Sequence, residues 1–309
     1  MRCLVTGGAG FIGSNLVDAL VERGDSVILL DDLSTGRRQN LEHALGRGAL
    51  LEVADIGHPE AVEAVIGNAR PEVVFHLAAQ IDVRYSVRRP TEDARTNVLG
   101  TITVLQAAQA AGAQRFVYSS SGGAAYGEAD VLPTPEEYPA HPLSPYGQSK
   151  YAAEGYCEVE TRAGGLSTVS LRYSNVYGPR QDPGLEGGVV AIFTRCLVEG
   201  RRPTVFGDGR QTRDWIEVSD VVRANLLAAE SDLVGPVNIG SGQETSVLDL
   251  IRALNEVSDR GTLPDPEFAP ERPGEVRRSC LSPERARREL GWEPRVELRE
   301  GLRRLLGAL

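Results

Sequence analysis

Residues 2–32 read RCLVTGGAGFIGSNLVDALVERGDSVILLDD, and their pattern is the strongest structural signal in the chain. Apolar residues open the stretch, and a turn with four glycines follows (Gly7, Gly8, Gly10 and Gly13). Apolar residues then recur at helical spacing as far as Gly24, and a second apolar run ends at Asp31. This order of strand, glycine turn, helix and strand predicts one βαβ unit.

The glycine turn predicts a dinucleotide site. Glycines allow a tight turn and bring backbone N–H groups close to a pyrophosphate, while the helix N-terminus adds partial positive charge. Asp31 stands 18 residues after Gly13, where a carboxylate can accept the hydroxyls of the adenosine ribose. Because Asp31 would repel a 2′-phosphate, the sequence favours NAD over NADP. Arg37 and Arg38 are the nearby residues that favour NADP.

Strands and helices alternate through the next part of the chain. Apolar runs predict strands at 50–53, 73–77, 115–121 and 168–172, and helical periodicity predicts helices near 39–45 and at 59–69, 91–112 and 146–162. The run at 73–77 is apolar throughout, as expected for a parallel sheet covered on both faces. We therefore expect an α/β fold with a doubly wound parallel (Rossmann-type) sheet.

The pattern changes beyond residue 165. Residues 173–187 are rich in glycine, proline and polar residues and predict a loop. Helices are expected at 189–197, 220–229, 247–257 and 282–291, with a short strand at 203–206. We expect an NAD-binding domain made of 1–172 plus roughly 213–240. Residues 173–212 and 241–309 are expected to form a smaller α/β substrate-binding lobe at the strand ends, where open α/β sheets bind ligands.

Composition excludes several classes of function. The chain has 309 residues and a net charge of −10, which argues against nucleic acid and anionic membrane surfaces as partners. No apolar run reaches transmembrane length, and a strand expected by residue 3 leaves no room for a signal peptide. Four scattered cysteines predict a cytoplasmic protein with reduced, buried thiols and no metal site (Cys3, Cys157, Cys196 and Cys280). His76 is expected to satisfy a hydrogen bond in the core.

Other residues are candidates for cofactor contacts. Asp55 follows the strand at 50–53, where a carboxylate can accept the adenine amino group while Ile56 packs on the ring. A helix-capping aspartate fits the same position equally well. Small residues at 78–79 would let a cofactor pass. Asn97 is a poor helix former inside an expected helix, and its amide can reach a neighbouring strand end.

A serine-bearing strand and a Tyr-Lys pair carry the candidate chemistry. Ser119, Ser120 and Ser121 end the strand at 115–121, and Tyr146 and Lys150 share one face of the next helix. An ammonium near a phenol favours the phenolate and lowers a pKa that is about 10 unperturbed. Such a phenolate can take a proton from a sugar or alcohol hydroxyl. The Tyr-Lys spacing alone is common on exposed helices and becomes specific only beside the glycine turn and the serines.

Two arginine motifs in the second half suit an anion. Arg213 precedes Asp214 and Trp215, and Arg272 lies three residues before Glu275. Arginine forks match a diphosphate, and a carboxylate matches ribose hydroxyls. A surface ion pair is the commoner role of such an arginine.

These motifs resemble those of the extended short-chain dehydrogenase/reductase family, and within it the nucleotide-sugar 4-epimerases typified by UDP-glucose 4-epimerase. The resemblance runs essentially end to end. It rests on TGGAGFIG at 6–13, DDLS at 31–34, LAA at 77–79, YSSS at 118–121, SPY at 144–146 with Lys150, and LRYSNVYGPR at 171–180.

The resemblance implies NAD-dependent epimerisation at C4 of a UDP-hexose through a transient 4-keto sugar. Tyr146 would be the base, Lys150 its activator and a ligand of the nicotinamide ribose, and Ser121 or Ser120 the hydroxyl partner. Many epimerases place that serine four residues before a Tyr-Gly pair, and here Gly122 occupies the position. Ser121 is therefore the expected hydroxyl.

The resemblance also implies the remaining ligands. The expected NAD contacts are Gly7, Gly10, Phe11, Ile12, Gly13, Asp31, Asp32, Ser34, Thr35, Gly36, Asp55, Ile56, Leu77, Ala78, Ala79, Gln80, Asn97, Ser119, Tyr146, Lys150 and Tyr173. The expected UDP-sugar contacts are Ser121, Tyr146, Asn175, Val189, Val205, Arg213, Arg272, Glu275 and Ser279. Arg213 and Arg272 would hold the diphosphate, Asn175 would contact the sugar diphosphate, and Glu275 would lie near the uridine ribose. A homodimer is implied through the helices at 91–112 and 146–162.

Substrate choice depends on a few positions. Small Ser279 leaves room for a 2-acetamido group by the family pattern, so we expect UDP-glucose and UDP-galactose activity with tolerance of UDP-GlcNAc and UDP-GalNAc. Related uronate epimerases tend to offer an arginine where this chain has Asp182, which is expected to repel a sugar carboxylate. UDP-glucuronate 4-epimerase is therefore the weaker alternative, kept open by nearby Arg84 and Arg88.

Other reactions of the family remain as alternatives. A 4,6-dehydratase would need an Asp-Glu pair where this chain has Gly122 and Gly123. A decarboxylase would need a carboxylate-binding arginine, and none is obvious. A catalytically silent NAD-sensing or scaffold protein is opposed by the intact Ser, Tyr and Lys set. A simple alcohol or ketone reductase would consume free NAD(P)H, which an epimerase would not.

Overall fold

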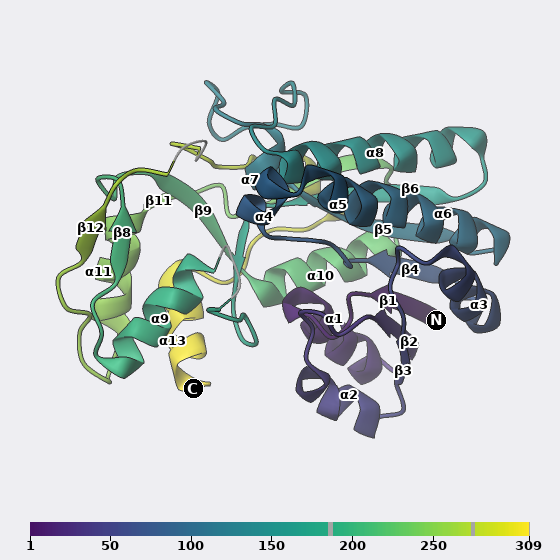
Figure 1. The fold of residues 1–309 in the computed structure, drawn as a ribbon, viewed down its shortest axis with the longest axis horizontal. Coiled ribbons are helices and arrows are strands. Elements are labelled where there is room, and N and C mark those ends of the chain that lie inside the picture. The colour runs from purple at the N-terminus through teal and green to yellow at the C-terminus, as the bar shows by residue number, and fades with distance from the viewer. Residues whose placement is uncertain (185–187, 273–275, 309) are drawn as a thin grey trace.

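The computed structural model describes residues 1–184, 188–272 and 276–308. The large sheet of these described residues contains β1 (Arg2–Thr6), β2 (Ser26–Asp31), β3 (Leu50–Val53), β4 (Val73–His76), β5 (Arg115–Ser121), β6 (Ser167–Tyr173) and β10 (Gly235–Ile239). Its order is β10-β6-β5-β4-β1-β2-β3, and every pairing is parallel (Figure 1). The strand order reverses between β1 and β4, where ligands of such sheets bind. The doubly wound parallel sheet is confirmed.

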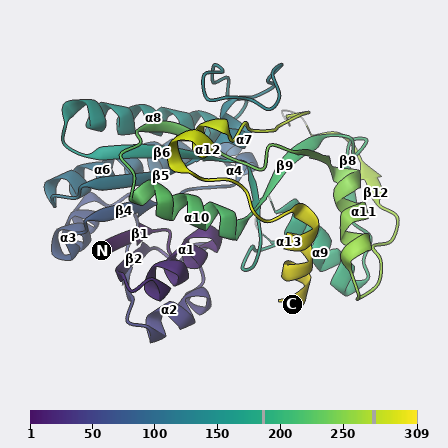
Figure 2. The same cartoon turned by 180° about the vertical axis from the view of Figure 1, so that it is seen from behind.

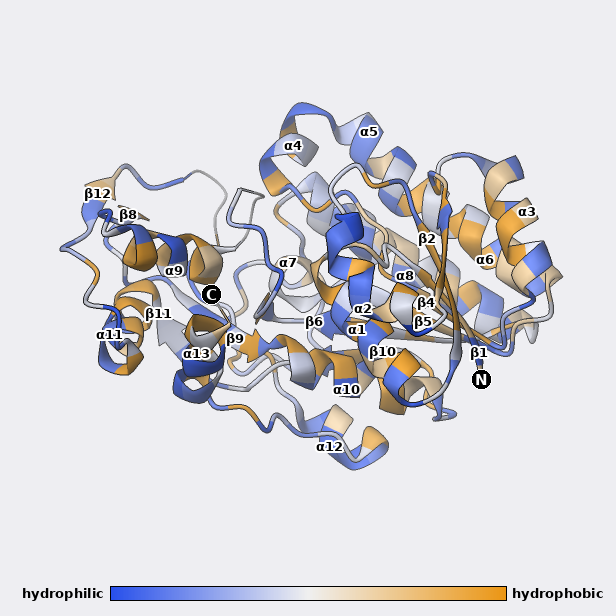
Figure 3. Cartoon of the chain, turned by 90° about the horizontal axis from the view of Figure 1, so that it is seen from below, coloured by the Kyte–Doolittle hydropathy of each residue, from blue (hydrophilic) through white to orange (hydrophobic). Residues whose placement is uncertain are grey.

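Helices cover both faces of this sheet. Helices α3 (Pro59–Ala69), α6 (Thr101–Ala110) and α8 (Pro145–Ala163) share one apolar core with it. Helices α1 (Phe11–Glu22), α10 (Val218–Ala229) and α12 (Glu284–Leu290) share the other. The strands β1 and β2 are largely apolar where they lie between these layers (Figure 3). Short elements η1 (Arg38–Leu41), α2 (Glu42–Gly46) and α7 (Gly122–Ala125) complete this part.

The helix expected at 91–112 is confirmed over most of its length, but it is not a regular α-helix. It consists of α5 (Pro90–Ala94), a π-helical segment η2 (Arg95–Gly100) and then α6, which follow one another without a break. Asn97 lies in η2, where its Oδ1 accepts from the Gln80 N–H at 2.8 Å and its Nδ2 donates to the Gln80 carbonyl at 2.9 Å. The expectation that this amide reaches a strand end is confirmed, because Gln80 follows β4. Single π-helical turns often mark functional positions.

A second, smaller lobe lies beside the large sheet (Figure 1). Its strands are β7 (Asn175–Tyr177), β9 (Thr212–Glu217) and β11 (Glu244–Ser246) in one sheet, and β8 (Thr204–Phe206) with β12 (Glu267–Ala269) in another. Its helices are α9 (Val189–Glu199), α11 (Val247–Val257) and α13 (Leu298–Gly307). These elements enclose a separate apolar core.

Several elements of this lobe were not expected. The loop assigned to 173–187 is wrong in part, because β7 lies inside it. Strands of three residues are too short to show a two-residue period, and their pairing partners lie far away in sequence. α13 was also not expected; its buried leucines lie on one stripe, between charged residues. Outside this lobe, α4 (Val83–Arg88) was also not expected. Asp82 caps it by accepting a hydrogen bond from the Tyr85 N–H.

The chain crosses between the two parts more than once. It leaves the large sheet at β6 for β7, and β9 belongs to the small three-stranded sheet. It then returns through α10 and β10. Figure 2 shows the C-terminal segment running from α12, beside the large sheet, to α13 in the second lobe. The division into 1–172 plus 213–240 and 173–212 plus 241–309 stays a prediction.

Candidate active site

The glycine turn joins β1 to the start of α1 and has no room for side chains. Gly7 has φ +68°, and a Cβ on it would lie 2.6 Å from the backbone nitrogen of Ala78. A Cβ on Gly13 would lie 2.1 Å from the Gly7 carbonyl oxygen. The turn therefore presents bare backbone at the N-terminus of α1, where partial positive charge favours an anion. This cradle fits the pyrophosphate of a dinucleotide.

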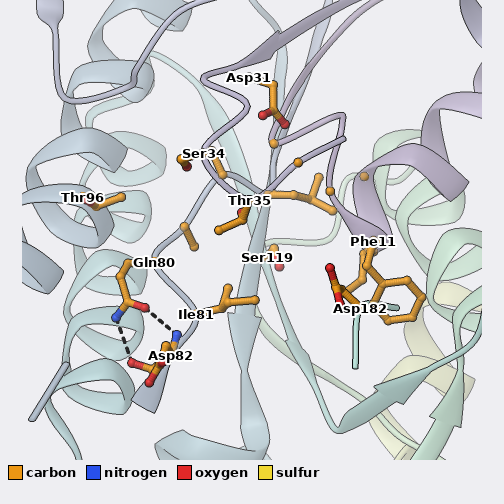
Figure 4. Close-up of a pocket in the computed structure, with 18 of the residues that line it drawn as sticks. Phe11, Asp31, Ser34, Thr35, Gln80, Ile81, Asp82, Thr96, Ser119 and Asp182 are labelled. Carbon is orange, nitrogen blue, oxygen red and sulfur yellow. Dashed lines mark hydrogen bonds between the residues drawn. The ribbon is translucent and has the colours of Figure 1, made fainter. Parts of the chain in front are cut away.

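A cavity of about 740 Å³ opens at this turn and at the carboxyl ends of the large-sheet strands. Every expected cofactor residue except Asn97 lines it, and Ser120 and Ser121 line it too. Figure 4 shows Asp31 and Ser34, Gln80 and Ile81, and Phe11 with Asp182 around the same space. Lining residues that the sequence did not single out come from short helical segments and from loops that follow strands, among them Asn40, Tyr85, Thr96, Ser174, Arg180 and Gln181.

Asp31 both faces the cavity and stabilises the turn. Its side chain is buried, and its two oxygens accept hydrogen bonds from the backbone N–H groups of Ala9 and Leu33, both at 2.8 Å. Burial raises the pKa of this carboxyl. A side chain at Gly36 would meet the same carboxylate, since a Cβ there would lie 2.7 Å from Oδ1. The end of β2 is thus locked against the glycine turn.

Arg37 and Asp182 form an ion pair at the edge of this cavity, and both residues line it. Arg37 compensates the charge of Asp182, which weakens the predicted repulsion of a sugar carboxylate. The pairing also gives Arg37 a role other than binding a 2′-phosphate. The sequence does not indicate this ion pair, because its two residues lie 145 positions apart.

The loop that carries Asp182 has two further attachments to α1. Arg180 donates to the carboxylate of Asp18 at 2.5 Å, and Asn15 donates to the Pro179 carbonyl at 3.1 Å. Arg180 has a φ of +71°, a left-handed conformation that is uncommon for a residue with a side chain. The loop after β7 is thereby held against the cofactor side of the molecule.

The three serines at the end of β5 have different partners. Ser121 and Tyr146 line the same cavity, and the interaction of the Ser121 hydroxyl with the phenol of Tyr146 lowers the pKa of that phenol. Ser120 is buried, and its hydroxyl donates to Glu154. The carbonyl of Ser119 accepts from the Lys150 ammonium at 2.7 Å. Because side chains alternate along a strand, Ser120 and Ser121 point to opposite sides, and only Ser121 meets Tyr146.

A buried ion pair lies behind the serines. Arg172 on β6 binds both carboxylate oxygens of Glu154 on α8, with contacts of 2.6 to 3.2 Å. Its remaining nitrogen donates to the hydroxyl of Tyr126 at 2.7 Å. Glu154 lies four residues after Lys150 on α8, so this pair fixes the helix that carries Tyr146 and Lys150 against the sheet. No local pattern in the sequence indicates this pair, because its partners come from separate elements.

The expected lowering of the Tyr146 pKa is not seen in the protein chain alone. Burial raises the pKa of Tyr146 to about 12, and the hydrogen bond from Ser121 offsets only part of this rise. Burial lowers the pKa of Lys150 to about 8. The ammonium of Lys150 lies 4.8 Å from the centre of the Tyr118 ring and donates to Ser119. Helical spacing brought Tyr146 and Lys150 to one face, but burial dominates the pKa of both groups.

Apart from Ser121 and Tyr146, those expected UDP-sugar residues that the structure describes lie outside this cavity. Asn175 pairs with Trp215 in the register of β7 and β9, and Arg213 lies two residues before Trp215 on β9. The segment that contains Ser279 joins the same edge, because Thr212 bridges to Arg278. These residues therefore line neighbouring strands of the small sheet.

The other expected contacts lie nearby in the second lobe. Val205 is buried on β8, Val189 begins α9, and the Arg272 guanidinium lies 3.7 Å from the centre of the Phe206 ring. Glu275 lies outside the described residues. Within the described chain, the buried Oδ1 of Asn175 has no hydrogen-bond partner, so it can accept one from a ligand.

Comparison with known proteins decides the family. The model of the NAD dependent epimerase/dehydratase family matches residues 3–240. The chain belongs to this family. It is 45% identical to a UDP-glucose 4-epimerase of Mycolicibacterium smegmatis, over 98% of this chain and 96% of that protein.

Two solved structures share the whole fold. One is a UDP-glucose 4-epimerase of Thermotoga maritima solved with UDP-glucose, with 48% identity, a TM-score of 0.95 and coverage of 100% of this chain and 98% of that one. The other is a UDP-glucose 4-epimerase of Thermus thermophilus in complex with NAD, with 41% identity, a TM-score of 0.92 and coverage of 100% and 98%.

Two searches of the described residues gave negative results. None of their helices is both long and apolar enough to cross a membrane. No cluster of three or more histidine, cysteine, aspartate or glutamate residues suited to a metal ion occurs among them.

Proposed function

We propose that this protein is an NAD-dependent UDP-hexose 4-epimerase that interconverts UDP-glucose and UDP-galactose through a transient 4-keto sugar. The observation that carries the proposal is that one cavity is lined by Ser121, Tyr146 and Lys150 together with the glycine cradle. The relatives named as UDP-glucose 4-epimerases match nearly the full length of the chain. The structures with NAD and with UDP-glucose support the same pair of ligands.

The cofactor residues would act in three groups. The cradle of Gly7, Gly10 and Gly13 would hold the pyrophosphate, and Asp31 would accept the adenosine ribose hydroxyls with the lone pairs that its backbone partners leave. Lys150 would bind the nicotinamide ribose, as it lines the same cavity. The bound nicotinamide supplies a reversible acceptor for the hydride on sugar C4.

Tyr146 would remove the proton from the sugar O4 and later return it. Its pKa of about 12 in the protein alone is too high for a base near neutral pH. The positive charges of Lys150 and of an oxidised nicotinamide both favour the phenolate and lower that pKa. Ser121 would hydrogen-bond the same sugar oxygen and keep it beside the phenol. Loss of the proton from O4 and of the hydride from C4 leaves the 4-keto sugar. Return of the hydride to the other face of C4 and of the proton to O4 completes epimerisation.

The second lobe would hold the nucleotide and leave the sugar free to turn. Arg213 and Arg272 would bind the diphosphate, and Asn175 would lie beside it, where its unpartnered amide oxygen can accept a hydrogen bond from the substrate. Val189, Val205 and Glu275 would contact the rest of the nucleotide. Firm binding of the nucleotide with few charged contacts to the sugar allows the 4-keto sugar to present either face. Small Ser279 would admit a 2-acetamido group.

UDP-glucuronate is the second candidate substrate class. Arg84 lines the cavity, and the charge of Asp182 is compensated by Arg37, so a sugar carboxylate meets less repulsion than the sequence suggests. A 4,6-dehydratase is disfavoured at Gly122, because a Cβ there would lie 2.5 Å from the side chain of Leu281. An acid at position 122 would therefore require the buried Leu281 side chain to move.

The test is to incubate purified protein with UDP-galactose, UDP-GalNAc and UDP-galacturonate separately, without reductant, and to follow products by NMR. A mixture of C4 epimers from UDP-galactose is the expected result, with slower conversion of UDP-GalNAc. Conversion of UDP-galacturonate alone would favour the uronate epimerase. Loss of water or CO₂, or no product from any sugar, would overturn the proposal.

We also infer a cytoplasmic homodimer. Apolar side chains are exposed along α8 and the neighbouring η2, with exposed fractions of 57% for Val159, 47% for Tyr156 and 58% for Leu99. An exposed apolar helix pair of this kind suits packing against a second copy. All four cysteines are free and buried, as expected in a reducing compartment. Analytical ultracentrifugation of the wild-type protein should give twice the chain mass. The double variant Val159→Glu, Leu99→Lys should give the mass of a monomer.

A further inference from the structure

Asp93 is a fully buried carboxylate that the proposed chemistry does not use. It lies on α5 with 0% of its surface exposed. Its Oδ1 accepts from Gln80 Nε2 at 2.7 Å and from Asn97 Nδ2 at 3.1 Å. Its Oδ2 is buried and has no hydrogen-bond partner in the described chain. Burying a carboxylate with incomplete hydrogen bonding is costly, so a structure that keeps one there calls for an explanation.

The partners of Asp93 connect it to the candidate active site. Gln80 lines the cofactor cavity, and Asn97 holds the backbone of Gln80 through both of its amide atoms. The same Asn97 amide lies 3.2 Å from the hydroxyl of Ser149, the residue before Lys150 on α8. One hydrogen-bonded cluster thus joins α5, η2, the loop after β4 and α8. Asp93 is its only charged member among the described residues.

The charge of Asp93 acts on both groups of the Tyr-Lys pair. It favours the protonated forms of Lys150 and Tyr146, raising the pKa of each. From α8 itself, Glu154 and the thiol of Cys157 also face Lys150. Glu154, however, is compensated by its ion pair with Arg172.

The remaining neighbours of Lys150 come from the sheet. Tyr118 on β5 lies under the ammonium, and burial raises the pKa of its phenol well above the ordinary value. His76 on β4 is kept neutral, since burial and Lys150 lower its pKa to about 3. Near neutral pH, Tyr118 therefore carries no negative charge and His76 carries no positive charge. The two donors to Asp93 are the neutral amides of Gln80 and Asn97. They do not compensate the negative charge of Asp93, which is therefore available to the Lys150 ammonium.

We propose, resting on the function proposed above, that Asp93 is a positioning residue of the active site. Its carboxylate orients the amides of Gln80 and Asn97 beside the cofactor cavity and supplies the negative charge of the cluster that adjoins the Lys150 segment of α8. A purely structural role would require only the hydrogen bonds. The two roles are separable, because the substitution Asp93→Asn would keep an acceptor oxygen and lose the charge.

The first test compares the pH dependence of kcat in wild type and Asp93→Asn. Removing the negative charge lowers the pKa of both Tyr146 and Lys150, so both limbs of the profile should move to lower pH by about one unit. Asp93→Glu, which retains the charge, should keep the wild-type limbs even if kcat falls. A profile of Asp93→Asn that superimposes on wild type would overturn the proposal.

A matched control is Asp220→Asn. Asp220 is also a buried aspartate, on α10, and accepts from the backbone N–H groups of Arg295 and Val296 at 2.9 Å. This variant should lose stability and leave the pH limbs in place. If Asp93→Asn does not fold, Asp93→Ser is the second neutral variant and should give the same displacement.

A titration without turnover separates this proposal from the proposed function. The ionisation of Tyr146 is read as the tyrosinate absorbance that disappears with Tyr146→Phe, in the NAD-loaded protein. In the Asp93→Asn background this signal should titrate about one pH unit lower than in wild type. An unmoved signal contradicts the role of Asp93 even if the enzyme epimerises UDP-sugars. A moved signal supports it even if the substrate assignment fails.

Discussion

The hydroxyl of Ser121 acts on the phenol of Tyr146 and lowers its pKa, whereas the hydroxyl of the adjacent Ser120 donates to Glu154. Two neighbouring serines thus have separate tasks, in keeping with the alternation of side chains along a strand. Both residues line the cavity, but only Ser120 also completes the buried Glu154–Arg172 pair.

Matched alanine variants should separate these two tasks. Ser121→Ala should lower kcat by roughly 10- to 100-fold with an unchanged free energy of unfolding, because it removes one hydrogen bond to the reacting oxygen. Ser120→Ala should reduce the free energy of unfolding by about 1–3 kcal/mol, because Glu154 loses a donor in a buried site. Steady-state kinetics and urea unfolding measure the two effects. The reverse pattern would assign the catalytic hydroxyl to Ser120.

Tyr146→Phe tests the proposed base. The variant keeps the ring and loses only the hydroxyl, so kcat should fall by roughly 10³-fold while the melting temperature changes little. NAD content, measured after denaturation, should match wild type because the glycine cradle is untouched. Residual activity within about tenfold of wild type would remove Tyr146 from its role. A catalytically silent NAD-binding protein would show no activity in either form.

Gly13→Ala tests the cradle. A Cβ at this position would lie 2.1 Å from the Gly7 carbonyl, so the turn must open to admit it. We expect NAD to be lost on purification and the free energy of unfolding to fall by about 1–3 kcal/mol. The control is Gly67→Ala in α3, where a Cβ would meet nothing within 4 Å. That variant should retain NAD and gain about 0.5–1 kcal/mol. Equal NAD content in both variants would contradict the cradle.

His76 gives the protein a measurable acid sensitivity. Its ring lies between the hydroxyls of Thr6 and Thr101, at 2.7 and 3.0 Å, which confirms the expected core hydrogen bond. Burial, with the charge of Lys150, lowers its pKa to about 3, whereas the unfolded chain titrates near 6.5. Between these values the unfolded state binds the extra proton, so the contribution of His76 to stability is complete above about pH 6.5 and falls as the pH drops toward 3.

The variant His76→Gln removes the imidazole, so its stability no longer depends on protonation at this position. Urea unfolding at about pH 7.5 and about pH 5.0 should show the stability advantage of wild type over the variant shrinking by about 2 kcal/mol. A constant difference between the two proteins would mean that His76 has the same pKa in the folded and unfolded states, and it would contradict the lowered pKa.

Local patterns in the sequence predicted the large sheet well, and contacts between distant segments account for the misses. The strand Leu50–Val53 and the helix Pro59–Ala69 have the predicted bounds, because each has its full apolar period within a few residues. The π-helical turn at Asn97 depends on the backbone of Gln80, which no local pattern reveals. The three-residue strands of the second lobe likewise depend on partners far along the chain.

In the candidate site, too, local patterns were predictive and contacts between distant segments were not. The residues that line the cofactor cavity were predictable because glycines, small residues and Asp31 follow strands of a regular sheet. The pKa of Tyr146 was not predictable, because the effect of burial on it outweighs the effect of the charge on its helical neighbour Lys150. The pairing of Arg37 with Asp182 joins loops from two halves of the chain, and it weakens the argument against a uronate.

The most direct test of the account uses UDP-glucose labelled with deuterium at C4. The account predicts that purified protein, in ordinary water and without added reductant, forms UDP-galactose that retains the deuterium at C4. Retention follows because the hydride removed from C4 returns to the same carbon on its other face. NMR of the product reads both the sugar and the label. UDP-galactose that carries hydrogen from water at C4, or the absence of any C4 epimer, would contradict the account.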